Sequence, residues 1–96
     1  MFSPGFYITA ELRVKDSAKT AEAKNALNLL CIATRKELGC HFFVMHQDLI
    51  TPTRLILWER FDNELALNHH FEQLHTKTYL ALDLTEVVCV FKTSTI

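Results

Sequence analysis

The sequence contains few of the residues that break or cross-link a chain. Its 96 residues include two glycines, two prolines and three cysteines, none of them in a CxxC pair. So little glycine and proline argues against a disordered or loop-rich protein. Each cysteine stands in an apolar run, so the odd number predicts buried reduced thiols rather than a disulfide or a metal site. We expect a single globular domain over residues 1–96.

The chain also lacks a charge excess and a long hydrophobic run. Ten basic and eleven acidic residues give a net charge of -1 without a basic block, which argues against binding to nucleic acid or to an anionic membrane. No window approaches the ~20 apolar residues of a membrane span, and the start has no charged region followed by an apolar one. The sequence therefore predicts a cytoplasmic protein without nucleic-acid or membrane partners.

Apolar and β-branched patterns predict four strands, at residues 6–14, 40–48, 53–61 and 85–93. Apolar residues at three- and four-residue steps predict a helix over about 18–38, ended by a left-handed Gly39. A second helix follows Asp62, which is placed to cap it. Its pattern breaks near Leu74 and resumes in a second helical piece that extends to Leu82.

This element order predicts an α+β, ferredoxin-like βαββαβ fold with a four-stranded antiparallel sheet. Two helices can cover only one face of such a sheet. Yet the strands carry apolar residues in both registers, as in the pairs Phe42 with Phe43 and Ile56 with Leu57. We therefore expect the second face to pack on a second copy of the chain, which gives a homodimer.

Three of the five histidines lie in the stretch "FDNELALNHHFEQLH", residues 61–75. His70 shares the inward helical stripe with Phe71, so it is either a proton-transferring base or a core histidine with satisfied ring nitrogens. His69 projects ~100° away, toward solvent. His75 lies beyond the helix break, where it either lines a pocket mouth or caps a helix. Because this spacing is not i, i+4 and no HExxH motif is present, we expect no metal site here.

The stretch "LILWERFDNELALNHHFEQLHTKTY" resembles the signature of the antibiotic biosynthesis monooxygenase family of small dimeric α/β barrels. The matching positions are Trp58, Glu59, Asp62, Ala66, His70, His75 and Tyr79. Two departures stand out. Thr76 replaces the aromatic residue that commonly follows the second histidine, and "AELRV" lacks the asparagine of the haem-degrading branch.

The resemblance implies a dimeric α/β barrel and a cofactor-independent monooxygenase that uses O2 on a quinol-like or polyphenolic substrate. A phenol must lose a proton before it can reduce O2, so such a pocket needs a base, and His70 is the candidate. Trp58, Phe71, His75 and Tyr79 are the candidate substrate-binding residues. Packing alone would equally explain Tyr79, and strands bury tryptophan for packing more often than for binding.

Two other functions remain open from the sequence. The same fold and histidine would suit an isomerase or degradation enzyme for a small sugar-derived signal, or a non-catalytic dimeric protein that binds a ligand or takes part in stress. Glu59 follows Trp58 on the opposite sheet face. If Glu59 faces the dimer contact, it needs a basic partner across the strands, for which Arg13, Arg54 and Arg60 are available.

Overall fold

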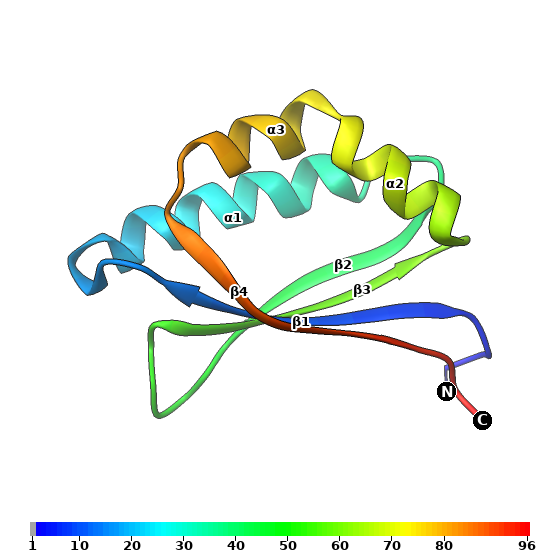
Figure 1. Ribbon diagram of the computed structural model, residues 1–96, viewed down its shortest axis with the longest axis horizontal. Coiled ribbons are helices and arrows are strands. Elements are labelled where there is room, and N and C mark those ends of the chain that lie inside the picture. Colours follow the sequence, from blue (N-terminus) through cyan, green and yellow to red (C-terminus); the bar gives the residue numbers. More distant parts are fainter. Residues whose placement is uncertain (1) are drawn as a thin grey trace.

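The computed structural model describes residues 2–96 as one sheet with a layer of helices on one side (Figure 1). In chain order the elements are β1 (Phe6–Val14), the short 3-10 helix η1 (Ser17–Lys19), α1 (Thr20–Thr34), β2 (Cys40–Gln47), β3 (Arg54–Phe61), α2 (Glu64–Glu72), α3 (Leu74–Ala81) and β4 (Thr85–Thr93). Each strand lies within one residue of its predicted bounds.

The sheet has the strand order β2-β3-β1-β4, and all neighbouring strands are antiparallel. The first and last strands lie side by side, which brings the two ends of the chain together in Figure 1. A register shift between Glu11 and Leu12 marks an irregularity in this last pairing. The order and directions confirm the predicted ferredoxin-like α+β fold.

Alternate residues of β1 point toward the helices and are buried, namely Ile8, Ala10, Leu12 and Val14. They meet the inner stripe of α1, where Ala23 and Leu27 are fully buried. Period two on the strand and period 3.6 on the helix therefore place the hydrophobic core between the two layers.

The end of α1 differs from the prediction. The helix stops at Thr34, and Leu38 at 104% relative exposure lies fully outside the core. Gly39 does not have a positive φ angle, so the predicted left-handed helix end is wrong. Gly39 is instead needed for space, because a Cβ there would lie 2.5 Å from the Cβ of Ala66. The four residues after Thr34 form turns that bring Glu37 inward.

The second helix begins one residue later than predicted. Asn63, not Asp62, is its N-cap, and the Asn63 side chain accepts a hydrogen bond from the Ala66 amide at 2.9 Å. Asp62 binds His41 instead, at 2.6 Å. The predicted break is confirmed: Gln73 is extended and separates α2 from α3.

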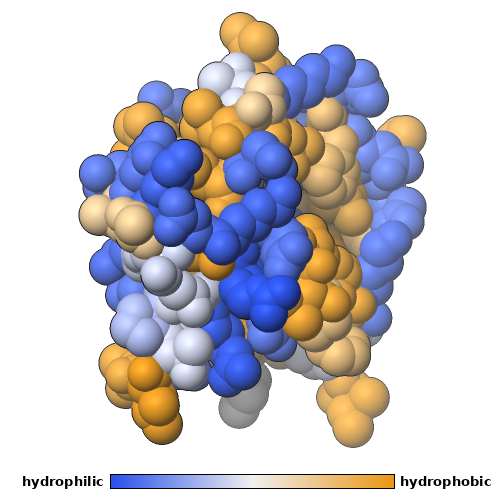
Figure 2. Space-filling view, turned by 60° about the vertical axis from the view of Figure 1, so that its left-hand side comes forward, coloured by the Kyte–Doolittle hydropathy of each residue, from blue (hydrophilic) through white to orange (hydrophobic). Residues whose placement is uncertain are grey.

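The face of the sheet away from the helices, called the open face below, carries apolar side chains at the surface. Trp58, Thr9 and Phe91 form a row across β3, β1 and β4 by their pairing, and Trp58 and Phe91 are exposed. Figure 2, which views the molecule from its side, shows hydrophobic residues at the surface among hydrophilic ones. Within residues 2–96, no helix has the length and apolar character to cross a membrane.

Candidate active site

A cavity of about 330 Å³ lies between the helices and the sheet and is called the inner cavity below. Most of its wall is apolar, including Leu57, Leu67 and Phe43. Its polar side chains include His70, Glu59, Thr76 and Tyr79. A small aromatic molecule needs a site of this size and character.

His70 is buried in the last turn of α2 and borders the inner cavity. Its ring packs against the rings of Phe43 and Phe61, each with a centroid distance of 5.4 Å. Its Nδ1 lies 2.8 Å from Oε2 of Glu37. A carboxylate can only accept, so Nδ1 carries the proton and Nε2 is left as the acceptor nitrogen. Within residues 2–96, Nε2 makes no hydrogen bond.

Two opposing influences act on His70. Burial lowers the pKa of its imidazole, because desolvation penalises the charged ring, while the hydrogen bond and the charge of Glu37 act to raise it. Burial is the larger influence. The ring is therefore neutral and able to accept a proton at ordinary pH, and Glu37 stabilises the imidazolium that would result.

Glu37 also binds His75. Its Oε2 lies 2.6 Å from Nε2 of His75, and the His75 ring centroid is 6.2 Å from that of His70. The sequence assigned the two histidines separate roles, and it did not indicate that Glu37, from the turn after α1, joins them. Among residues 2–96, these three groups bring their donor atoms close enough to hold a metal ion, within 4.8 Å of one another.

Tyr79 and Phe71, the predicted substrate-binding residues on α3 and α2, both border the inner cavity. The Phe71 ring lies 5.3 Å from the His70 ring and is partly exposed. The Tyr79 hydroxyl shares a hydrogen bond with the hydroxyl of Thr85, and burial raises the pKa of this phenol. Tyr79 is therefore a neutral hydrogen-bonding group in the wall.

Glu59 is buried under the helices, although it neighbours an exposed tryptophan. Its cross-strand neighbours are Ile8 and Phe43, both in the core. Glu59 therefore does not face the open side, the case in which an arginine partner was expected, and within residues 2–96 it forms no ion pair. Desolvation raises its pKa to about 8, so this carboxyl group is mainly protonated at neutral pH. Glu59 thus gives the inner cavity a neutral proton donor.

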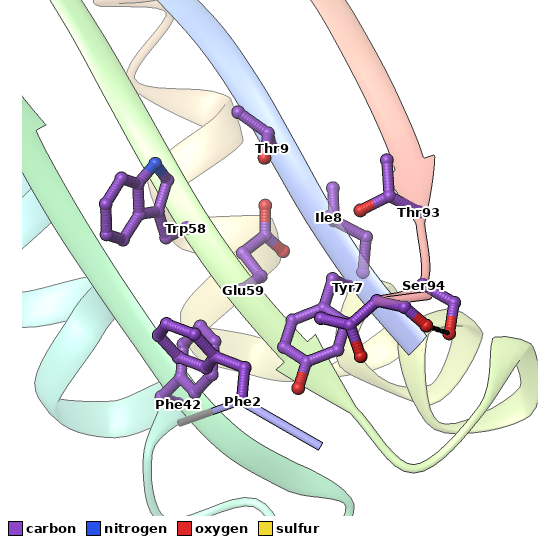
Figure 3. A pocket seen from close by; sticks show the side chains of 10 residues that line it. Phe2, Tyr7, Ile8, Thr9, Phe42, Trp58, Glu59, Thr93 and Ser94 are labelled. Carbon is purple, nitrogen blue, oxygen red and sulfur yellow. Dashed lines mark hydrogen bonds between the residues drawn. The ribbon is translucent and has the colours of Figure 1, made fainter. Parts of the chain in front are cut away.

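Trp58 lies on the open face and not in the inner cavity. It borders a separate hollow of about 230 Å³, together with Tyr7, Thr9 and Phe42 (Figure 3). Its ring is 4.3 Å from that of His46. Any contact between Trp58 and a substrate would therefore take place in this second hollow, away from His70.

The structure thus brings together three of the five predicted site residues, His70, Phe71 and Tyr79. His75 lies outside the inner cavity and Trp58 on the other sheet face. Sequence reasoning missed Glu37 because it assigned residues up to Leu38 to a helix. It noticed Glu59, but only as a structural residue. Glu59 shares one strand face with Leu55, Leu57 and Phe61, and this apolar register is the signal that could have indicated a buried acid.

Comparison with known proteins gives consistent results. The chain matches the family described as antibiotic biosynthesis monooxygenase over residues 5–82. A Bacillus subtilis (strain 168) protein, YjcS, is 32% identical over 88 residues, which cover 92% of this chain and 84% of that protein. The solved structure of YjcS aligns with a TM-score of 0.86 at 31% identity, covering 95% of this chain and 98% of that one.

A crystal structure described as an antibiotic biosynthesis monooxygenase also has a TM-score of 0.86, at 16% identity, over 95% of this chain and 98% of that chain. A conserved protein from Methanosarcina mazei Go1 has a TM-score of 0.78 at 26% identity, over 90% of this chain and 89% of that chain. At 16% identity the likeness concerns the fold alone.

Proposed function

The chain belongs to the antibiotic biosynthesis monooxygenase family, and from this premise we propose that it is a cofactor-independent monooxygenase of a quinol-like or polyphenolic aromatic compound. The main support is the position of His70. His70 borders an apolar cavity and keeps Nε2 as a free acceptor, while Glu37 holds Nδ1. The arrangement matches what deprotonation of a phenol requires.

In the proposed reaction, Nε2 of His70 takes the proton of a substrate hydroxyl. The resulting anion is electron-rich enough to pass electrons to O2. One oxygen atom then enters the ring and the other leaves as water, so that a hydroquinone becomes a hydroxyquinone and itself supplies all the electrons. The charge of Glu37 stabilises the imidazolium, and the protonated Glu59 donates a hydrogen bond to a substrate oxygen.

The test is oxygen uptake by the purified protein with a panel of benzo- and naphthohydroquinones. We expect His70→Gln to lower kcat by about 100-fold or more. His69→Gln is the matched control, because His69 is the exposed neighbour and its ring shares a hydrogen bond with Gln73. Thermal unfolding of both variants separates a lost base from a lost fold.

A folded His70→Gln variant with the rate of the wild-type protein would remove His70 from the mechanism. Absence of oxygen uptake with every hydroquinone would instead favour the isomerase or the non-catalytic ligand-binding function.

We further propose that the protein is a homodimer through the open face. The support is the row of Trp58, Thr9 and Phe91, which leaves two large apolar side chains in water in a single chain. Isologous pairing of two such faces would cover both rows at once. It would also close the hollow beside Trp58, so that this second space becomes internal.

A further inference from the structure

A carboxylate and two imidazoles from three separate parts of the chain converge beside the inner cavity. Glu37 comes from the turn after α1, His70 from the last turn of α2 and His75 from the first turn of α3. One donor atom of each lies within 4.8 Å of the others. We propose that these three residues form a binding site for a divalent transition-metal ion of the zinc class.

The donor set favours zinc and its neighbours in the transition series. Imidazole nitrogen and carboxylate oxygen are typical zinc ligands, whereas calcium and magnesium prefer sites made of oxygen alone. Tetrahedral ligands at a Zn–N distance of about 2.1 Å stand roughly 3.4 Å apart. The two contacts to Glu37, at 2.8 and 2.6 Å, would lengthen to reach this spacing. The donor atoms already lie within 4.8 Å of one another, and the surface residue His75 can make the adjustment.

The environment of the Glu37 carboxylate independently supports a bound cation. Its side chain is 7% exposed, and its Oε1 is buried without a hydrogen-bond partner within residues 2–96. A buried carboxylate oxygen without a hydrogen-bond partner from the chain is costly, because no protein donor offsets its desolvation. The two imidazoles satisfy only Oε2. A divalent cation would compensate the whole carboxylate.

An ion can also reach this cluster. A surface depression of about 410 Å³ is lined by Glu37, His75, Lys36 and Gln73, among others. The His75 side chain is 26% exposed there. Three protein donors with an opening to solvent leave a further coordination position for water. The ion would enter from this depression and not through the inner cavity.

Occupancy of the site would change what His70 can do. An ion on Nδ1 displaces the proton that Nδ1 now donates in its hydrogen bond to Glu37, and the neutral ring then carries its proton on Nε2. Nε2, the nitrogen that acts as the base in the proposed reaction, then donates instead of accepting. Metal binding would therefore switch off the base. This last consequence rests on the proposed function, whereas binding of the ion does not.

The test uses the full-length protein after treatment with EDTA and removal of the chelator. Binding of Zn²⁺ is measured by calorimetry. Binding of Co²⁺ is measured by the visible absorption that this ion shows when nitrogen and oxygen atoms ligate it. We expect saturation at one ion per chain and a higher melting temperature with Zn²⁺. His75→Ala should weaken binding by at least about 10-fold, while His69→Ala, which removes an exposed histidine outside the cluster, should leave it unchanged.

A Glu37→Gln variant provides a second measurement, because it keeps the shape of the side chain and removes its charge; it too should weaken binding. The site is refuted if binding does not saturate, if folded His75→Ala and Glu37→Gln bind like the wild-type protein, or if His69→Ala loses the ion. Saturable Zn²⁺ binding without loss of hydroquinone oxidation would refute the base role of His70 and leave the metal site standing.

Discussion

Trp58 and Glu59 are adjacent in the chain but lie on opposite faces of the sheet, one 47% and the other 7% exposed. The pleat of β3 imposes this separation, because successive side chains of a strand point to opposite faces. Glu59 therefore faces the inner cavity and Trp58 faces the open side of the sheet. Each of the two residues leads to a measurable prediction.

Glu59 should make stability depend on pH. Its pKa in the folded protein, about 8, is above its ordinary value of 4.5. The stabilisation of the neutral carboxyl group is fully present below pH 4.5 and is lost as the pH rises through 8. Glu59→Gln keeps the neutral form at every pH. As the pH rises within this window, we expect the free energy of unfolding of Glu59→Gln to increase relative to that of the wild-type protein by up to ~1.4 kcal/mol per pH unit.

Urea unfolding between pH 5 and pH 9 measures this difference, with Glu22→Gln on the exposed side of α1 as the control. Parallel stability curves for Glu59→Gln and the wild-type protein would show that Glu59 ionises normally.

Trp58 should report on association, because it is the only tryptophan of the chain. If the open face is the dimer contact, dilution exposes the indole and shifts its emission to longer wavelength. Phe91→Asp, in the same row, should yield monomers in sedimentation velocity. Leu65→Asp places the same charge at an exposed position of α2 and should leave the dimer intact. A monomeric wild-type protein at micromolar concentration would refute the interface.

Gly39 should be intolerant of even one methyl group. Its new Cβ would lie 2.5 Å from the Cβ of Ala66, so Gly39→Ala should cost about 1–3 kcal/mol of unfolding free energy. The loss should shrink in an Ala66→Gly background, since that change removes the opposing atom. A double-mutant cycle in urea measures the coupling. Additive effects would show that the two positions do not touch.

Asn63 should stabilise the helix that carries His70. Its side chain accepts a hydrogen bond from the Ala66 amide, so Asn63→Ala should lower the unfolding free energy by about 1 kcal/mol. Asn63→Asp keeps the acceptor and adds a charge that suits a helix N-terminus, and its stability should equal or exceed that of the wild-type protein. Chemical unfolding of the wild-type protein and the two variants measures these differences. Equal losses of unfolding free energy in both variants would contradict the capping role.

The sequence by itself determined the elements and the fold. Three patterns depend only on residues close together in the chain: strand alternation, helical spacing and the break near Leu74. The structure contains the elements that all three predict. His70 was predictable as an inward residue for the same reason. The helix ends were less predictable, because Gly39 was assigned from backbone preference when its role is to make room for Ala66.

Only the tertiary structure decided which residues share a site. Glu37 meets His70 and His75 across more than thirty positions of sequence, and nothing local to the turn after α1 indicates that contact. Likewise, the alternation of β3 separates Trp58 from Glu59, but only the packed helices show which of the two faces the inner cavity. A periodic pattern is determined by residues close together in the chain, whereas a cluster of donor atoms depends on how the helices and the sheet pack together.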